Sequence, residues 1–378
     1  MKTFSNSNKN MIYLVDFIGI HCGMHYYLDA FKRILESIDG IKVGIISNYS
    51  DNDKPPVLLN HYKGNKLNKL VLAARNLRRL NKFIRSHKDD RFIYLTYGNI
   101  LDPFFLKAIS KAPHHCIDIH EALAQNEDSN QRLRKRLSKV YTHCIQNVIS
   151  HSARTDDFLM QFGFKGRRYE VPHFKYVFPR NYNPLNISDE VKNSIDKEKV
   201  NILFFGNLTR EKGIDILLEA VNNLNEDDAP RINIIVAGKD IDGVYKRVKI
   251  NQDRNISFFI RHITDDELRY LYENVNYLAL PYRKTSQSGI LEMAFYFKKP
   301  IIASDIPYFR KMLTLFPSFG YLNGNSSSDF SYAIHEILKC KPSDFFRDDD
   351  YARYENRMEI NEFKQQFKEW LKLDGETL

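Results

Sequence analysis

The sequence has no apolar run that approaches the ~20 residues a helix needs to cross a bilayer. It also lacks the pattern of a secretory leader, because the polar first ten residues are followed by an apolar stretch that contains Asp16 and runs into His21. Cysteine is scarce, with four residues and no C-x-x-C pair, so neither a disulfide framework nor a cysteine zinc site is predicted. We therefore expect a cytoplasmic chain.

Acidic residues are few in the first half of the chain, and the charge is strongly uneven. Residues 1–180 hold 29 Lys and Arg against 16 Asp and Glu, whereas the remainder holds 27 against 31. The basic half should therefore face an anionic partner. Composition alone leaves nucleic acid, a lipid surface and a phosphorylated acceptor open.

Short β-rich runs alternate with helical patterns, and this alternation occurs twice along the 378 residues. The runs at 11–20 and 41–47 begin the first series, and those at 200–206 and 232–238 begin the second. The pattern predicts two doubly wound α/β domains of the Rossmann type, in which ligands bind at the carboxyl ends of the strands. We place the first domain at 1–180, a polar linker at 181–197 and the second domain at 198–355.

The segment FFGNLTREKGIDILLEA, residues 204–220, carries the first chemical signal. A predicted strand ends at Gly206, a polar turn follows, and a helix begins near Gly213. Lys212 lies at this junction, where a cation and the unpaired N–H groups of a helix start can bind a diphosphate together. The alternative is a solvated loop lysine in front of an ordinary amphipathic helix.

The second signal is PYRKTSQSGILEMAFYFKKPIIAS, residues 281–304, which reads as a strand end, a small polar loop, a helix and another strand. Gln287, Ser288 and Gly289 offer an amide, a hydroxyl and backbone N–H groups to sugar and phosphate oxygens. Glu292, one turn inside the helix, offers a carboxylate to two ribose hydroxyls. The alternative is that Ser288 caps the helix and Glu292 only favours the helix dipole.

In this order, the two segments resemble the family 4 glycosyltransferases. The first is similar to that family's G-R-L-x-x-x-K-G segment, and the second to its E-x-x-x-x-x-x-x-E segment in the variant with an S-Q-S-G loop. The resemblance continues through the glycine-pair loop at 18–31 and the His-Asp element at 118–123. It implies the GT-B fold, with two Rossmann-like domains facing a cleft and a C-terminal helix, 356–378, packing back toward the first domain.

The resemblance also implies an activity. It implies a retaining, metal-independent hexosyltransferase that moves a sugar from a nucleotide-diphosphate donor to a glycan or lipid-linked acceptor, in surface polysaccharide biosynthesis and with no cofactor. The implied catalytic residues are His120, Lys212 and Glu292. The implied donor-binding residues are Gly23, Gly206, Asn207, Arg210, Lys212, Gln287, Ser288, Gly289 and Glu292.

The sequence departs from the family pattern at two positions that matter. Asn207 stands where the family has an arginine, and Lys284 stands where the first glutamate of the pair falls. Arg210 could supply the missing arginine charge. Two alternatives therefore stay open, a non-catalytic GT-B binding protein and a GT-B sugar-nucleotide epimerase. The D-x-D formed by Asp240 and Asp242 is a very common pattern, and we expect no metal there.

A long basic stretch, residues 63–88, contains no acidic residue and has leucines at helical spacing. Such a helix can lie on anionic lipid, although an ordinary solvated basic face explains the pattern equally well. No recognition motif accompanies the charge, so we expect no nucleic acid partner. We expect peripheral contact with the inner face of the plasma membrane through Lys66, Lys69, Arg78, Arg79, Lys82 and Arg85.

Overall fold

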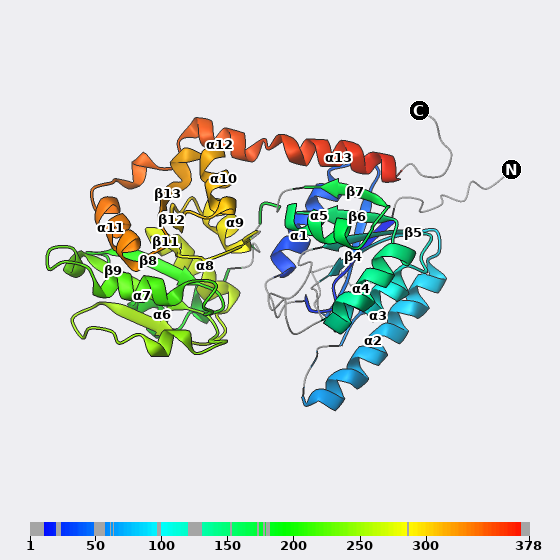
Figure 1. The fold of residues 1–378 in the computed structure, drawn as a ribbon, viewed down its shortest axis with the longest axis horizontal. Helices are drawn as coiled ribbons and strands as arrows, with labels where there is room; N and C mark the ends of the chain where they lie inside the picture. The colour runs from blue at the N-terminus through cyan, green and yellow to red at the C-terminus, as the bar shows by residue number, and fades with distance from the viewer. Residues whose placement is uncertain are drawn as a thin grey trace. The chain divides into compact units, whose positions relative to one another are not determined.

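The chain divides into two compact units, each of which is an α/β domain (Figure 1). Unit 1 comprises Met1–Phe174 and Met358–Leu378, and unit 2 comprises Lys175–Arg357. The computed structural model describes residues 11–19, 24–48, 57–60, 62, 64–96, 100–119, 131–151, 153–171, 174–176, 178, 182–285 and 287–371.

Unit 1 is built on a seven-stranded sheet with the order β3-β2-β1-β4-β5-β6-β7, in which the strand pairs are parallel. The strands are β1 (Met11–Val15), β2 (Lys42–Ser47), β3 (Val57–Leu58), β4 (Arg91–Thr96), β5 (His114–Ile119), β6 (Asn147–Ser150) and β7 (Arg167–Glu170). The helices are α1 (Met24–Glu36), α2 (Lys66–Ser86), α3 (Asp102–Ile109), α4 (Gln131–Cys144), α5 (Ala153–Gln161) and α13 (Met358–Leu371).

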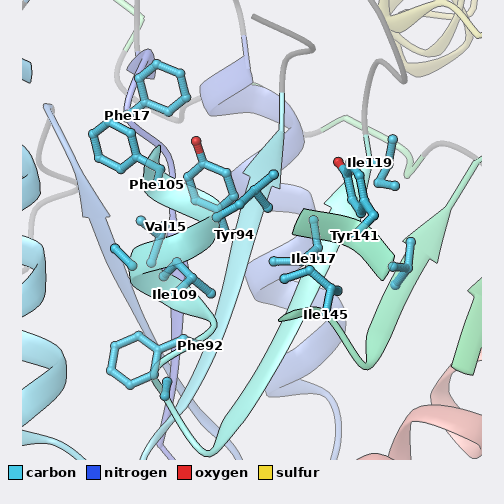
Figure 2. Close-up of a cluster of buried hydrophobic side chains, with 14 of the residues drawn as sticks. Val15, Phe17, Phe92, Tyr94, Phe105, Ile109, Ile117, Ile119, Tyr141 and Ile145 are labelled. Atoms are coloured by element: carbon cyan, nitrogen blue, oxygen red, sulfur yellow. The ribbon is translucent and has the colours of Figure 1, made fainter. Parts of the chain in front are cut away.

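One face of this sheet is covered by α2, α3, α4 and α5, and a continuous apolar cluster fills the space between them and the strands. Figure 2 shows its centre, where Phe17 stacks on Phe105 with ring centroids 4.7 Å apart. Tyr141 from α4 and Phe92 from β4 lie in the same cluster. The central strands β1 and β4 are buried on both faces, which explains why they read as continuous apolar runs in the sequence rather than as alternating ones.

The other face of the sheet is covered by α1 and α13. Phe363 and Phe367 of α13 contact Phe31 of α1 and Tyr169 of β7, with ring centroids 6.2 and 5.5 Å apart respectively. The C-terminal helix expected from the family resemblance is thus α13, and it packs within unit 1 through these aromatic contacts. Among the described residues, no helix is both long enough and apolar enough to cross a membrane.

Unit 2 is built on a six-stranded sheet with the order β10-β9-β8-β11-β12-β13, again with parallel pairs. The strands are β8 (Val200–Phe205), β9 (Ile232–Ala237), β10 (Ile256–Phe259), β11 (Tyr277–Leu280), β12 (Ile301–Ser304) and β13 (Gly320–Asn323). The α-helices are α6 (Asp189–Asn193), α7 (Ile214–Asn222), α8 (Asp265–Asn274), α9 (Gly289–Tyr296), α10 (Pro307–Leu315), α11 (Ser327–Ile337) and α12 (Asp348–Glu355). Short 3₁₀ turns occur at η3 (Pro184–Asn186), η4 (Ala229–Arg231), η5 (Val244–Arg247), η6 (Pro317–Phe319) and η7 (Pro342–Asp344).

Both sheets reverse their strand order in the middle, so each has a switch point at which ligands of α/β domains bind. In unit 1 the reversal lies between β1 and β4, and in unit 2 it lies between β8 and β11. The predicted pair of doubly wound, Rossmann-like domains is therefore confirmed. The expected linker, 181–197, belongs to unit 2 from Tyr182 onward and contains η3 and α6.

Candidate functional site

The turn between β8 and α7 begins and ends with a glycine whose backbone lies in the positive-φ region. Gly206 has φ 113° and Gly213 has φ 67°, conformations that L side chains rarely adopt. A Cβ atom on Gly213 would lie 1.8 Å from the carbonyl oxygen of Pro281, so α7 begins in close contact with the residue that follows β11. The two glycines thus bring the ends of β8 and β11 together at the switch point of unit 2.

Lys212 extends its side chain back across this turn. A Cβ atom on Gly206 would lie 2.7 Å from Lys212 Nζ and 2.8 Å from Cδ1 of Ile290, a residue in the first turn of α9. The ammonium also lies 5.6 Å from the ring centroid of Tyr282, whose hydroxyl pKa is raised by burial. Lys212 is half-buried, and its ammonium lies between Gly206, the first turn of α9 and Tyr282, which follows β11.

The N-terminal end of α9 faces the same place. The Ser288 side chain caps the helix by accepting a hydrogen bond from the Leu291 amide at 3.3 Å. Gly289 is required by close packing, because a Cβ there would lie 2.3 Å from the Tyr176 hydroxyl. Gln287 is half-buried beside the cap. The capping alternative for Ser288 is therefore correct for its side chain, while the amides of the first helical turn keep the polarity that attracts anions.

Two ion pairs fasten the loop after β11 to the first turn of α7 and to the turn before it. Arg283 forms a bidentate pair with Asp215, both distances being 2.8 Å. Lys284 Nζ lies 3.0 Å from Glu211 Oε1. Lys284 stands at the position where the family resemblance expects a glutamate. It pairs with Glu211, the residue before Lys212. Neither pair follows from the sequence, since the partners are separated by 68 and 73 positions.

Glu292 lies one turn into α9 and is almost completely buried, with 1% of the residue exposed. The Arg357 guanidinium donates to both carboxylate oxygens, at 3.3 and 3.0 Å, and the Tyr354 hydroxyl donates at 2.7 Å. Burial alone would lower the pKa of Arg357, but the Glu292 carboxylate raises it above its usual value. These contacts fix the Glu292 carboxylate, and its contact with ribose stays a prediction.

The remaining donor-site candidates lie on the surface of the same turn. Asn207 and Arg210 are exposed, and the Arg210 amide donates to Asp242 at 2.8 Å. Asp240 accepts from the Gly243 amide at 2.7 Å. The two D-x-D carboxylates therefore bond to backbone amides, Asp240 in the loop after β9 and Asp242 in the turn before α7. Among the described residues, no group of three or more His, Cys, Asp or Glu side chains is placed to hold a metal ion.

In unit 1, the predicted residues Gly23 and His120 lie outside the described residues. Two positions before His120, however, Asp118 belongs to a buried polar network that sequence reasoning missed. The Asp118 carboxylate accepts a hydrogen bond from the Tyr27 hydroxyl, and its Oδ1 lies 2.9 Å from Nε2 of His151. The network joins α1 to the carboxyl ends of β5 and β6.

Both ring nitrogens of His151 lie close to oxygen atoms. Its Nδ1 is 3.0 Å from the Val171 carbonyl oxygen, and its Nε2 is 3.1 Å from the Tyr27 hydroxyl as well as close to Asp118. One feature of the sequence could have pointed to this network: His151 directly follows β6, and β6 is the neighbour of β5, which contains Asp118.

The basic residues predicted on the membrane or acceptor surface all belong to α2. Lys66 begins the helix, which is capped by the Asn65 side chain accepting from the Asn68 amide at 2.9 Å. The exposed side chains among the predicted residues are Lys69, Arg78, Arg79, Lys82 and Arg85. The sequence analysis did not predict that three apolar residues of the same helix are exposed: Leu67, Leu70 and Val71.

Replacing Gly206 with alanine should displace the Lys212 ammonium and lower the melting temperature of unit 2. The new methyl group would overlap Lys212 Nζ, and the φ of 113° adds backbone strain of about 1–3 kcal/mol. Calorimetry and a donor-binding titration measure both effects. Gly243→Ala is the matched control: its φ is 67°, but no heavy atom lies within 4 Å of the new Cβ, so only strain is added. Equal donor affinity in the two variants would contradict the placement of Lys212.

Comparison with protein families matches residues 187–357 to the family model of glycosyl transferases group 1. This range lies within unit 2 and ends at Arg357. It includes the β8–α7 turn, the start of α9 and the buried partners of Glu292. No curated protein matches the chain in a sequence search.

Solved structures with the same fold match nearly the whole chain. Sucrose-phosphate synthase from Thermosynechococcus elongatus has a TM-score of 0.66 at 13% identity, covering 95% of this chain and 98% of that one. HepE from Anabaena, in complex with UDP-glucose, has a TM-score of 0.65 at 15% identity, with coverages of 96% and 99%. WaaG, a glycosyltransferase involved in lipopolysaccharide biosynthesis, has a TM-score of 0.62 at 12% identity, with coverages of 94% and 98%.

These likenesses establish the architecture, and the family match lies on the unit that contains Lys212. Residues 187–357 thus match the model of glycosyl transferases group 1, and they lie in a chain whose two-unit α/β fold is similar to that of solved glycosyltransferases.

Proposed function

We propose that the chain is a retaining, metal-independent glycosyltransferase of family 4, hexosyltransferase type. It would move a sugar from a nucleoside diphosphate donor to a glycan or lipid-linked acceptor, in the assembly of a surface polysaccharide. Unit 2 would bind the donor and unit 1 the acceptor. The family match lies on unit 2 alone, and the proposed reaction uses both units.

One observation carries this proposal: a half-buried ammonium, a glycine and a helix start converge at the switch point of unit 2. Lys212 Nζ lies within contact distance of the position of a Cβ on Gly206, and Ile290 of α9 contacts the same position. A diphosphate at this place would meet a fixed positive charge and the helix N–H groups together. The carboxylates nearest to Lys212 in the sequence, Glu211 and Asp215, pair with Lys284 and Arg283 respectively.

The reaction breaks the bond between the anomeric carbon and the diphosphate oxygen and forms a bond from that carbon to an acceptor hydroxyl oxygen. The hydroxyl proton leaves with the diphosphate or a nearby base, and the two electrons of the broken bond stay on the diphosphate. Negative charge therefore grows on the phosphate oxygens as the bond breaks. Lys212 would stabilise this charge with no reorganisation, since its side chain already lies against Tyr282.

The other residues would position the two substrates. Gln287, Ser288 and Gly289 would line the phosphate and sugar, and His120 would act beside the reacting carbon from unit 1. A carboxylate can accept about four hydrogen bonds, and the contacts to Arg357 and Tyr354 use three on Glu292. One acceptor position, on Oε1, is left for a ribose hydroxyl.

The relatives in fold support the choice of donor and acceptor class. HepE was solved with UDP-glucose, and WaaG is described as acting in lipopolysaccharide biosynthesis. A nucleoside diphosphate hexose and an acceptor on a lipid are therefore the first pair to test. An anionic membrane surface would be the natural source of such an acceptor.

The test is a panel of nucleotide sugars, with release of the nucleoside diphosphate and the anomeric form of the freed or transferred sugar both measured. A transferase should hydrolyse one donor slowly and retain its anomeric configuration, and EDTA should leave the rate unchanged. Release of a free epimerised sugar nucleotide would favour a sugar-nucleotide epimerase instead. No turnover, and no thermal shift with uridine or guanosine diphosphate, would favour a non-catalytic binding protein.

A further inference from the structure

Helix α2 is far longer than the neighbouring helix on the same face of the unit 1 sheet. At about 1.5 Å per residue, the 21 residues of α2 span about 31 Å and the eight residues of α3 about 12 Å. Both helices end five residues before the next strand begins, so their C-terminal ends lie level at the amino edge of the sheet. About 19 Å of α2 therefore extends beyond the start of α3, and α2 is the long helix at the lower side of unit 1 in Figure 1. Asn76 of α2 bonds to Asn60, just after β3 at the carboxyl edge of the sheet, so the residues before Asn76 extend past this edge.

The burial pattern along α2 agrees with this geometry. Residues 67–71 are all exposed, and the first buried side chain is that of Ala73. Three of the exposed residues are apolar: Leu67, Leu70 and Val71 are 69%, 60% and 43% exposed. Their spacing of three and four residues places them on one side of the helix. The projecting end of α2 thus carries an apolar patch that unit 1 does not bury.

The same side of the helix becomes basic further along. Val71, Arg78 and Arg85 are seven residues apart and so lie on one face of the helix. Arg78 and Arg85 are both exposed, and no acidic residue occurs in the whole stretch 63–88. The face therefore begins with an apolar tip and continues as a row of cations over about 20 Å.

This order of side chains fits the interface of an anionic lipid bilayer better than other surfaces. Aliphatic side chains enter the boundary between headgroups and acyl chains, while cations on long stems stay beside the lipid phosphates. Three aliphatic side chains are too few for the roughly 800 Å² per partner that a stable protein interface buries. They also lack the aromatic rings on which nucleic acid bases stack.

We propose that the N-terminal end of α2 inserts Leu67, Leu70 and Val71 into an anionic bilayer, with Arg78 and Arg85 contacting the headgroups. The projecting end lies at the carboxyl edge of the unit 1 sheet, the edge at which α/β domains bind ligands. Insertion would hold this edge beside a lipid-linked acceptor. In this respect the inference rests on the proposed transferase function.

The test is co-sedimentation of the full-length protein with vesicles of phosphatidylcholine containing 30% phosphatidylglycerol. The triple variant Leu67→Ser, Leu70→Ser, Val71→Ser should partition at least about tenfold more weakly, in both low and high salt, because hydrocarbon burial is not screened. Leu185→Ser is the control: Leu185 is 89% exposed on η3 of unit 2, and its loss should change nothing. Unchanged binding of the triple variant would overturn the proposal.

A charge variant separates the two contributions. Neutralising Arg78 and Arg85 with glutamine should weaken partitioning by about tenfold or more in low salt and have little effect in 0.5 M salt, because the Debye length there is only a few ångströms. Equal binding to vesicles of phosphatidylcholine alone would also overturn the proposal. Donor hydrolysis without vesicles should be unchanged in the triple serine variant.

A wild-type chain that binds vesicles but turns over no donor would contradict the proposed function and leave the membrane insertion supported.

Discussion

Lys212→Ala should lower kcat/KM for the donor by about 10²-fold or more, the usual scale for loss of a fixed charge that stabilises a leaving group. The Lys212 ammonium lies over Tyr282 and against Gly206, so it is already in place before a donor arrives. The variant should have a lower kcat as well as a higher KM, because the charge on the phosphate grows as the bond breaks. Steady-state kinetics with the best donor of the panel measures it.

Two further variants separate charge from packing at this site. Lys212→Met keeps the alkyl contact with Tyr282 and should lose as much activity as the alanine variant, with a smaller change in melting temperature. Lys246→Ala removes an exposed lysine, 3.8 Å from Asp240, on the next loop of unit 2 and should retain full activity. An unchanged rate in both Lys212 variants would show that Lys212 does not act in the site. The proposed reaction would then lose the observation on which it rests.

The two α/β domains were predictable because their central strands, such as β4 and β9, are buried on both faces and read as continuous apolar runs. Two strand ends of unit 2 were predicted one residue late. The run 200–206 ends as β8 at Phe205, and the run 232–238 ends as β9 at Ala237. In both cases the extra residue is a glycine with positive φ, at 113° in Gly206 and 147° in Gly238. An apolar run does not reveal where the backbone leaves the extended conformation.

The polar partners in the candidate site were not predictable, because they depend on tertiary contacts. Glu292 and Arg357 are 65 positions apart, and Tyr27 and Asp118 are 91 apart. No spacing rule connects such residues, because each pair joins two elements that meet only in the folded structure: α9 with the segment after α12, and α1 with β5. The α2 projection illustrates the same limit: its helical spacing was visible in the sequence, but the exposure of Leu67 depends on how short α3 is.

Arg357→Met should destabilise unit 2 by about 3–5 kcal/mol, since it leaves the Glu292 carboxylate buried without its counter-ion. Arg357 is 7% exposed and Glu292 1%, so water cannot replace the lost guanidinium. For a domain of this size, the expected fall in melting temperature is about 10 °C. Arg269→Met is the control. Arg269 pairs with Glu273 one turn away at a site 30% exposed, where such pairs contribute about 0.5 kcal/mol or less.

The double variant Glu292→Gln, Arg357→Met separates the structural role of this pair from donor binding. Glutamine keeps an oxygen for the Tyr354 hydroxyl and carries no charge, so most of the lost stability should return. If Glu292 also contacts the ribose, the refolded double variant should still bind uridine or guanosine diphosphate at least about tenfold more weakly than wild type, the scale of one hydrogen bond to a charged group. If a fully stable double variant binds the nucleoside diphosphate as tightly as wild type, Glu292 has only a structural role, which is to pack α9 against Tyr354 and Arg357.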